Sequence, residues 1–166
     1  EMTLIIEPNN CYNMDCEIGM KLMQEQGLKA DWCITDPPYG IGIEKMSFTQ
    51  SGAKTIGKAT RRDYTSISDW DKVRIGENII SLMRECSENQ IIFGGNYYAD
   101  ILPPTKSWVV WNKRSCALTD RNDFADCELA WTSFHKTVRK YFQSWVGANA
   151  KEKTDKYRIN PTKKPI

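Results

Sequence analysis

Short apolar runs alternate with amphipathic segments along much of the chain, which is the order expected when strands and helices take turns. This alternation favours an α/β fold with helices flanking an open, mostly parallel sheet. Strands are predicted at the apolar runs 3–6, 30–35, 90–93, 107–113, 127–134 and 138–146, with a briefer one in 11–16. Helices are predicted over 16–26, from about 69 to 87, and over 96–102.

Residues at the ends of these segments indicate where the helices start and stop. Asp15 is a candidate N-cap for the first helix, and Gly27 fits its C-terminal stop. Ser68 and Asp71 have capping-box-like spacing ahead of the second helix, with Asp in place of the usual Glu. Asn96 follows two glycines and is expected to cap the third helix.

The run 30–35, expected to be a buried strand, leads directly into a rigid acidic turn, Asp36-Pro37-Pro38-Tyr39-Gly40. A residue before proline is pushed to extended geometry, and proline has no N–H to donate. Carbonyls near the two prolines are therefore free to accept hydrogen bonds beside an aromatic ring. Such a rim suits a planar group that carries an NH2, and the exocyclic amine of a nucleobase is such a group.

A simple turn would also explain Asp-Pro-Pro, since both residue types are common turn formers. The place of the motif favours a site, because open α/β sheets bind ligands at the carboxyl ends of their strands. From the residues alone, both interpretations stay open.

At Asp36 to Tyr39 the chain resembles the amino-methyltransferases, whose hallmark is Asp-Pro-Pro-Tyr and whose Asp form acts on adenine N6 in DNA. The resemblance implies a Rossmann-like fold, S-adenosylmethionine as cofactor and DNA as partner. It also implies that Tyr39 stacks on a flipped adenine while the Asp36 side chain and the Pro37 carbonyl accept from its amine. The catalytic residues would then be Asp36, Pro37, Pro38 and Tyr39.

Two further segments carry the resemblance toward the cofactor. Asp15 and Cys16 resemble the family's segment before a helix, whose acidic residue lies near the cofactor's adenine, although capping alone also explains the aspartate. Residues 160–165 resemble His-Pro-Thr-Gln-Lys-Pro, with Asn160 replacing the His and Lys163 the Gln. The cofactor-binding residues implied are Asp15, Cys16, Asp36, Thr162, Lys164 and Pro165. A basic, frayed terminus over 151–166 is the alternative for the last three.

The least regular region, 41–70, has two open interpretations. It is rich in Gly, Ser and Thr, and a loop of this length in a compact domain is usually functional or disordered. As a DNA-contacting loop it would meet phosphates through Lys54, Lys58, Arg61 and Arg62. As a solvated mobile loop it would have no such role.

The family also has a glycine-rich turn near the active cleft and a segment that helps wall the target-base pocket. Gly94-Gly95 resembles the first, and residues 128–131 resemble the second. For Trp108, Trp111 and Trp131 we expect core packing rather than base stacking, because aromatic side chains dominate cores.

Composition bounds the function without naming it. The chain has 166 residues, enough for one domain over 1–166, and a net charge of +2 that does not by itself identify a nucleic-acid binder. The six cysteines lack Cys-x-x-Cys spacing and are expected to be reduced thiols in a cytoplasmic protein. Cys33 and Cys86 are expected in the core.

The histidine count and the lengths of the apolar runs argue against several classes of site and segment. A single histidine, His135, argues against a histidine-rich metal site and a Ser-His-Asp hydrolase, and a structural role is expected for it. No run approaches the ~20 apolar residues of a membrane span, and no signal peptide opens the sequence. We therefore expect neither a metal nor a membrane partner.

The motif order matches the permuted class, in which the target-base motif comes first. In that order a Phe-x-Gly-x-Gly-like cofactor loop lies further toward the C-terminus, and the 166 residues end before one occurs. We therefore expect a partial catalytic domain with weak cofactor binding and little turnover alone. The alternatives are an inactive DNA-binding remnant, a split enzyme completed by a partner or as a homodimer, and methylation of RNA or protein amides.

Overall fold

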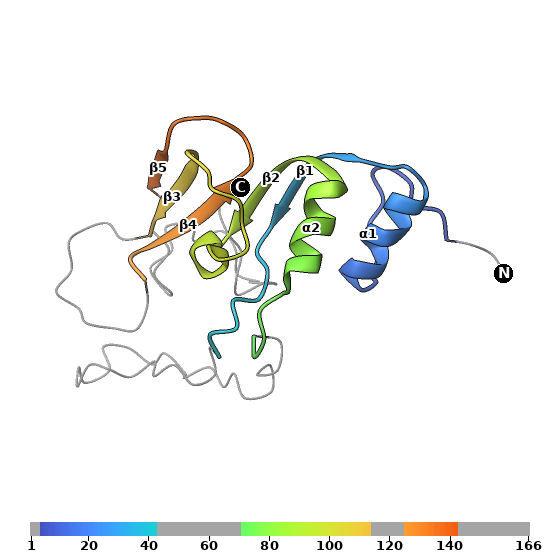
Figure 1. The fold of residues 1–166 in the computed structure, drawn as a ribbon, viewed down its shortest axis with the longest axis horizontal. Helices are drawn as coiled ribbons and strands as arrows, with labels where there is room; N and C mark the ends of the chain where they lie inside the picture. Colours follow the sequence, from blue (N-terminus) through green and yellow to red (C-terminus); the bar gives the residue numbers. More distant parts are fainter. Residues whose placement is uncertain (1–3, 43–70, 114–124, 143–166) are drawn as a thin grey trace, which may run out of the picture.

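The structure is a computed structural model that describes residues 4–42, 71–113 and 125–142 (Figure 1). The predicted loop 41–70, apart from its first two residues, and the basic segment 151–166 lie outside the described residues. The elements, in chain order, are α1 (Cys16–Glu25), β1 (Ala30–Thr35), α2 (Glu77–Glu85), β2 (Ser87–Phe93), the 3-10 helix η3 (Gly95–Tyr98), β3 (Trp108–Asn112), β4 (Cys127–Thr132) and β5 (Arg139–Phe142).

The strands form one open sheet in the order β1-β2-β4-β3-β5. The pairs β1–β2 and β3–β5 are parallel, whereas β4 runs antiparallel to both of its neighbours, β2 and β3. The α/β class predicted from the sequence is confirmed. The sheet is mixed rather than mostly parallel as expected, because β4 runs antiparallel to both of its neighbours.

Helix α1 begins and ends where the sequence predicts, to within one residue. The Asp15 carboxylate accepts hydrogen bonds from the amides of Glu17, at 2.8 Å, and Ile18, at 3.3 Å. At the other end Gly27 has a φ of 67°, and the Leu28 amide donates to the Met23 carbonyl at 2.8 Å. The Gly27 amide bonds the Gln24 carbonyl at 3.0 Å, which completes a Schellman motif.

Helix α2 is shorter than predicted at both ends. It starts at Glu77, and its N-cap is Gly76, which has no side chain to cap the helix. The predicted C-terminal residue, Ser87, instead opens β2, where its backbone pairs with Ala30. Strand β2 is thus longer than the predicted 90–93.

The apolar face of α2 and the middle of the sheet form the core. Figure 1 shows α2 lying against β1 and β2, with α1 packed beside α2. The cluster consists of Ile79, Ile80, Met83, Ile92, Tyr98, Leu102 and Trp131. The core placement predicted for the tryptophans is confirmed: Trp111 and Trp131 are buried and Trp108 packs against the cluster. Of the two cysteines expected in the core, Cys86 is buried and Cys33 half-buried.

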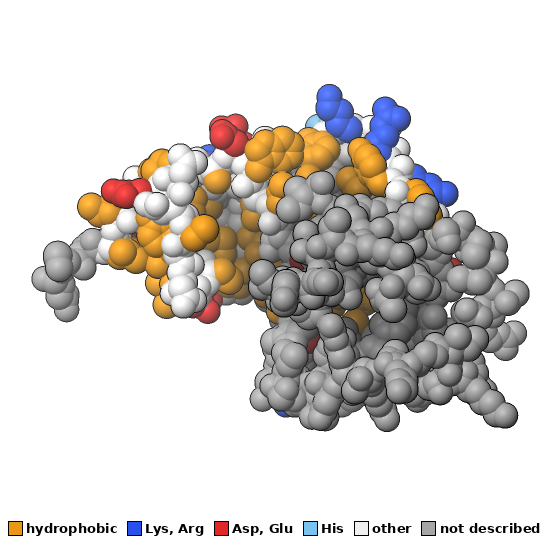
Figure 2. Space-filling model, turned by 180° about the vertical axis from the view of Figure 1, so that it is seen from behind, with side chains coloured by type: hydrophobic (Ala, Val, Ile, Leu, Met, Phe, Trp, Pro, Cys, Tyr) orange, Lys and Arg blue, Asp and Glu red, His pale blue; other side chains and the backbone are white. Residues whose placement is uncertain are grey.

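Strand β1 is not the buried strand that its apolar run predicts. Trp32 and Ile34 are 50% and 59% exposed, because they lie on the sheet face opposite Cys33, which packs against the core. Phe134 gives Trp32 an edge-on ring contact at 5.7 Å. Figure 2 shows hydrophobic side chains at the surface of the side that faces away in Figure 1.

Two predicted strands near the N-terminus do not form. The backbone at 4–6 is hydrogen-bonded to a side chain instead: the Gln26 amide accepts from the Ile6 N–H at 2.9 Å and donates to the Leu4 carbonyl at 2.8 Å. Residues 11–15 are likewise irregular up to the start of α1. The third predicted helix is also reduced, to the four residues of η3, and Gly94 rather than Asn96 is its N-cap.

Candidate functional site

The turn that follows β1 is fixed by a buried carboxylate. Asp71 is 2% exposed, and its Oδ1 accepts hydrogen bonds from the amides of Tyr39, at 2.8 Å, and Gly40, at 3.0 Å. The Asp71 carbonyl also accepts from the Gly42 amide at 3.2 Å. Bonds to a charged acceptor are the stronger kind, so Asp71 determines the course of the chain after the two prolines. The sequence assigned Asp71 to a helix cap, and that prediction is wrong.

The Tyr39 side chain folds back over the acidic residue of the motif. Its hydroxyl donates a hydrogen bond to the Asp36 carboxylate, and its ring stacks on Tyr97 with centroids 4.6 Å apart. Burial, followed by the Asp36 hydrogen bond and charge, holds the pKa of the Tyr39 phenol far above its ordinary value. Tyr39 is therefore a neutral hydrogen-bond donor to Asp36 throughout the physiological range.

The Tyr39 ring occupies space that is open only because residue 94 is a glycine. Gly94 has a φ of 67°, and a Cβ on it would lie 2.0 Å from Cε1 of Tyr39. This glycine ends β2, the parallel neighbour of β1, so the carboxyl ends of the two strands meet here. The contact places Gly94 beside Tyr39, and its place near an active cleft stays a prediction.

The η3 segment supports the turn from the other side. The Tyr98 hydroxyl donates to the Pro38 carbonyl, and burial raises the pKa of Tyr98 to about 12. Arg74 forms an ion pair with Asp100 and donates to the Tyr97 carbonyl at 2.7 Å. The aromatic pair is thus held by polar contacts at both of its backbones.

A second ion pair lies within electrostatic reach of the same turn. Lys113, which follows β3, pairs with Glu128 of β4, and both side chains are largely buried. The Glu128 charge also contributes to raising the pKa of Tyr39, after burial and Asp36. The expectation that residues 128–131 wall the target-base pocket stays a prediction.

The four predicted catalytic residues therefore lie together at the carboxyl end of β1, with Asp36 exposed and Pro37 buried. Pro38 already holds the Tyr98 hydroxyl, whereas the Pro37 carbonyl accepts no hydrogen bond from the described residues. Asp36 and the Pro37 carbonyl are the acceptors that the arrangement presents to a ligand. A carboxylate has about four lone-pair positions, so Asp36 can accept further bonds besides the one from Tyr39.

The predicted cofactor and DNA residues have different outcomes. Asp15 is the N-cap of α1 and Cys16 is its exposed first residue, and within the described chain no hydrogen bond or ion pair joins either to the Asp36 turn. The other predicted residues lie outside the described ranges: Thr162, Lys164 and Pro165 for the cofactor, and Lys54, Lys58, Arg61 and Arg62 for DNA. His135, expected in a structural role, is exposed and borders a pocket.

Comparison with protein-family models, with curated proteins and with solved structures found no match. Across residues 4–42, 71–113 and 125–142, no helix has the length and apolar character needed to cross a membrane. In the same residues no group of three or more His, Cys, Asp or Glu side chains is placed to hold a metal ion. The case for a function therefore depends on the residues and geometry of the Asp36 turn.

Proposed function

We propose that the chain is an amino-methyltransferase that transfers a methyl group from S-adenosylmethionine to the exocyclic N6 of a flipped adenine in DNA. The observation that carries the proposal is the Asp36-Pro-Pro-Tyr turn. It follows a strand with a parallel neighbour, and the buried Asp71 fixes it. Ligands of open α/β sheets bind at this end of the strands.

In this proposal the amine is recognised by two acceptors. The Asp36 carboxylate and the Pro37 carbonyl each accept a hydrogen bond from one of the two N–H groups of the adenine amine. These bonds draw the nitrogen toward tetrahedral geometry, which frees its lone pair to attack the methyl carbon. The N6–C bond forms as the methyl–sulfur bond breaks, and one amine proton then leaves to solvent. Positioning and electrostatics supply the catalysis, and no covalent enzyme intermediate is needed.

The aromatic residues would hold the base in this geometry. One face of the Tyr39 ring lies against Tyr97, so a stacked base would use the opposite face. The hydrogen bond from the Tyr39 hydroxyl orients the Asp36 carboxylate before the base arrives. Flipping costs a few kcal/mol of stacking and pairing, and stacking on Tyr39 would offset part of that cost.

The described residues fit the charge of the proposed cofactor. Its sulfonium and amino groups are cationic, and the carboxyl end of β1 presents the exposed Asp36 carboxylate beside the Tyr39 ring. When bound, the cofactor supplies an electrophilic methyl group. The exposed Asp15 carboxylate at the start of α1 is a further candidate contact, in addition to its role as N-cap.

The test is to identify the methylated product. The chain, in excess, is incubated with isotopically labelled S-adenosylmethionine and unmethylated DNA, and with RNA and protein in parallel reactions. The nucleosides or amino acids are then separated by mass spectrometry. The proposal expects the label in N6-methyldeoxyadenosine. Label in N4-methyldeoxycytidine, in RNA or in a protein amide would replace it with another amino-methyl transfer, and the absence of any labelled product would overturn it.

A further inference from the structure

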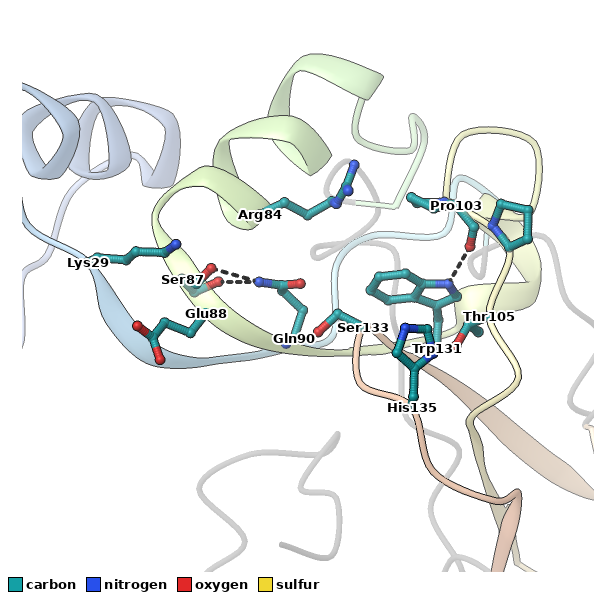
Figure 3. Close-up of a pocket in the computed structure, with 11 residues that line it drawn as sticks. Lys29, Arg84, Ser87, Glu88, Gln90, Pro103, Thr105, Trp131, Ser133 and His135 are labelled. Carbon is teal, nitrogen blue, oxygen red and sulfur yellow. Dashed lines mark hydrogen bonds between the residues drawn. The ribbon is translucent and has the colours of Figure 1, made fainter.

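A second candidate site lies at the opposite end of the sheet from Asp36. Ser87 pairs with Ala30 at the start of β2, whereas the Asp36 turn follows the far end of β1. Around Ser87 the surface is hollowed into a pocket of about 390 Å³, within the size range of small-molecule sites (Figure 3). The described residues that line it are Lys29, Arg84, Ser87, Glu88, Gln90, Pro103, Pro104, Thr105, Trp131, Ser133 and His135.

A buried amide presents a fixed acceptor to this pocket. Gln90 is only 4% exposed, and its Nε2 donates to the Ser87 carbonyl at 2.9 Å and to the Ser87 Oγ at 3.0 Å. A backbone carbonyl can only accept, so the amide nitrogen must face Ser87. Oε1 therefore points the other way, toward the Trp131 side of the pocket in Figure 3. No donor from the described residues bonds this oxygen.

Two cationic side chains flank the same pocket. Lys29 reaches in from the segment before β1, and Arg84 stands on α2 above the strand (Figure 3). Neither forms an ion pair with the described residues, and both residues are exposed. The imidazole of His135 also lines the pocket, and Glu88 is the one acidic residue of the described lining. The balance of charge favours an anion.

Apolar side chains border the pocket beside these groups. Trp131 is 3% exposed, and its Nε1 donates to the Pro103 carbonyl at 2.8 Å, so it supports Pro103 from the core. Pro103 and Pro104 present rigid rings to the pocket. Ser133 also lines the pocket. Its Oγ accepts a hydrogen bond from the backbone N–H of Gln90 at 2.9 Å, so the Ser133 hydroxyl proton can be donated to a ligand.

We propose that this pocket binds a nucleoside monophosphate. Its phosphate dianion meets Arg84 and Lys29, an N–H of the base donates to Gln90 Oε1, and the flat ring packs against the rings of Pro103 and Pro104. The two cationic side chains, the Gln90 acceptor and the apolar rings come from separate observations, and all of them line the same pocket. The pocket is separate from the Asp36 turn, so substitution of Asp36 leaves this binding unchanged.

The test uses adenosine monophosphate as the probe, titrated into the full chain with amide chemical shifts as the readout. Saturable binding with shifts around Ser87, Gln90 and Ser133 is expected. Purine riboside monophosphate, which lacks the amine, is expected to bind about three- to tenfold more weakly, because the Gln90 acceptor is left without a donor. Adenosine, which lacks the phosphate, is expected to lose about tenfold or more.

Charge variants avoid disturbing the buried amide. Arg84→Gln is expected to weaken binding about tenfold and Glu88→Gln to strengthen it, whereas Arg139→Gln, an exposed cation on β5, is the matched control and leaves it unchanged. The absence of saturable binding of adenosine monophosphate would overturn the proposal. Equal affinity for purine riboside monophosphate, or equal weakening by Arg84→Gln and Arg139→Gln, would overturn it as well.

Discussion

Replacing Gly94 by alanine tests whether the space beside this glycine is what positions Tyr39. Gly94 and Gly27 both have a φ of 67°, so an alanine at either site carries the same backbone strain, about 1–2 kcal/mol. They differ in their surroundings. A Cβ on Gly27 would meet nothing within 4 Å, whereas one on Gly94 would lie 2.0 and 2.4 Å from two ring carbons of Tyr39.

The difference between the two variants isolates the steric term. Overpacking of this kind costs about 1–3 kcal/mol, since the ring cannot move away without breaking its stack on Tyr97. We therefore expect Gly94→Ala to lower the free energy of unfolding by about 2–5 kcal/mol and Gly27→Ala by about 1–2 kcal/mol. Urea unfolding followed by circular dichroism measures both.

A double-mutant cycle attributes the effect to Tyr39. Tyr39→Ala removes the obstructing ring, so Gly94→Ala in that background is expected to cost no more than Gly27→Ala, which is a coupling of about 1–3 kcal/mol. If Gly94→Ala and Gly27→Ala destabilise equally, or if the cycle is additive, the reasoning that Gly94 makes room for Tyr39 is refuted.

Three further predictions concern the same turn and the first helix. Asp71→Ala is expected to cost about 2–4 kcal/mol of unfolding free energy, because it leaves the Tyr39 and Gly40 amides without their acceptor; Asp71→Asn keeps an acceptor oxygen and is expected to cost less, and equal losses in urea would contradict this. Burial raises the pKa of Tyr98 from 10.0 to about 12, so this tyrosine ionises at lower pH in the unfolded chain than in the folded one. The free energy of unfolding is therefore expected to fall as pH rises from 10.0 to about 12. Tyr98→Phe should remove this part of the decline. Asp15→Ala is expected to cost about 1 kcal/mol through the lost N-cap, whereas Asp15→Asn should preserve stability in the same assay.

The features that the sequence predicts well depend on local chemistry. The ends of α1 follow from Asp15 and Gly27, whose cap and left-handed backbone act within a few residues of the chain. The extended geometry before the two prolines is local in the same way, because each proline restricts itself and the residue before it. These elements need little from the rest of the fold to form.

The features that it misses depend on contacts between distant residues. Asp71 completes a capping-box-like pattern with Ser68, but it bonds amides 31 and 32 residues away, so that spacing was misleading. A search for an acceptor for the amides after Pro38 could have pointed to an acidic residue, though not to which one. The stacking of Tyr97 on Tyr39 and the bond from Tyr98 to Pro38 were missed, because both depend on β2 lying beside β1, which places η3 next to the turn.

Sheet direction and burial were missed for a related reason. An apolar run such as 30–35 predicts a strand, but its pattern alone does not say whether both faces are covered, and Trp32 and Ile34 are exposed. The antiparallel placement of β4 likewise depends on pairing between distant strands and has no local signature.

The measurement that tests the central claim most directly compares two aspartates of one segment in the methyl-transfer assay. Asp36 follows β1 and would hold the reacting amine, whereas Asp31 is an exposed aspartate near the other end of the same strand. The account predicts that Asp36→Ala abolishes label in N6-methyldeoxyadenosine while Asp31→Ala retains it, with both variants folded by circular dichroism. Full methyl transfer by Asp36→Ala would contradict it.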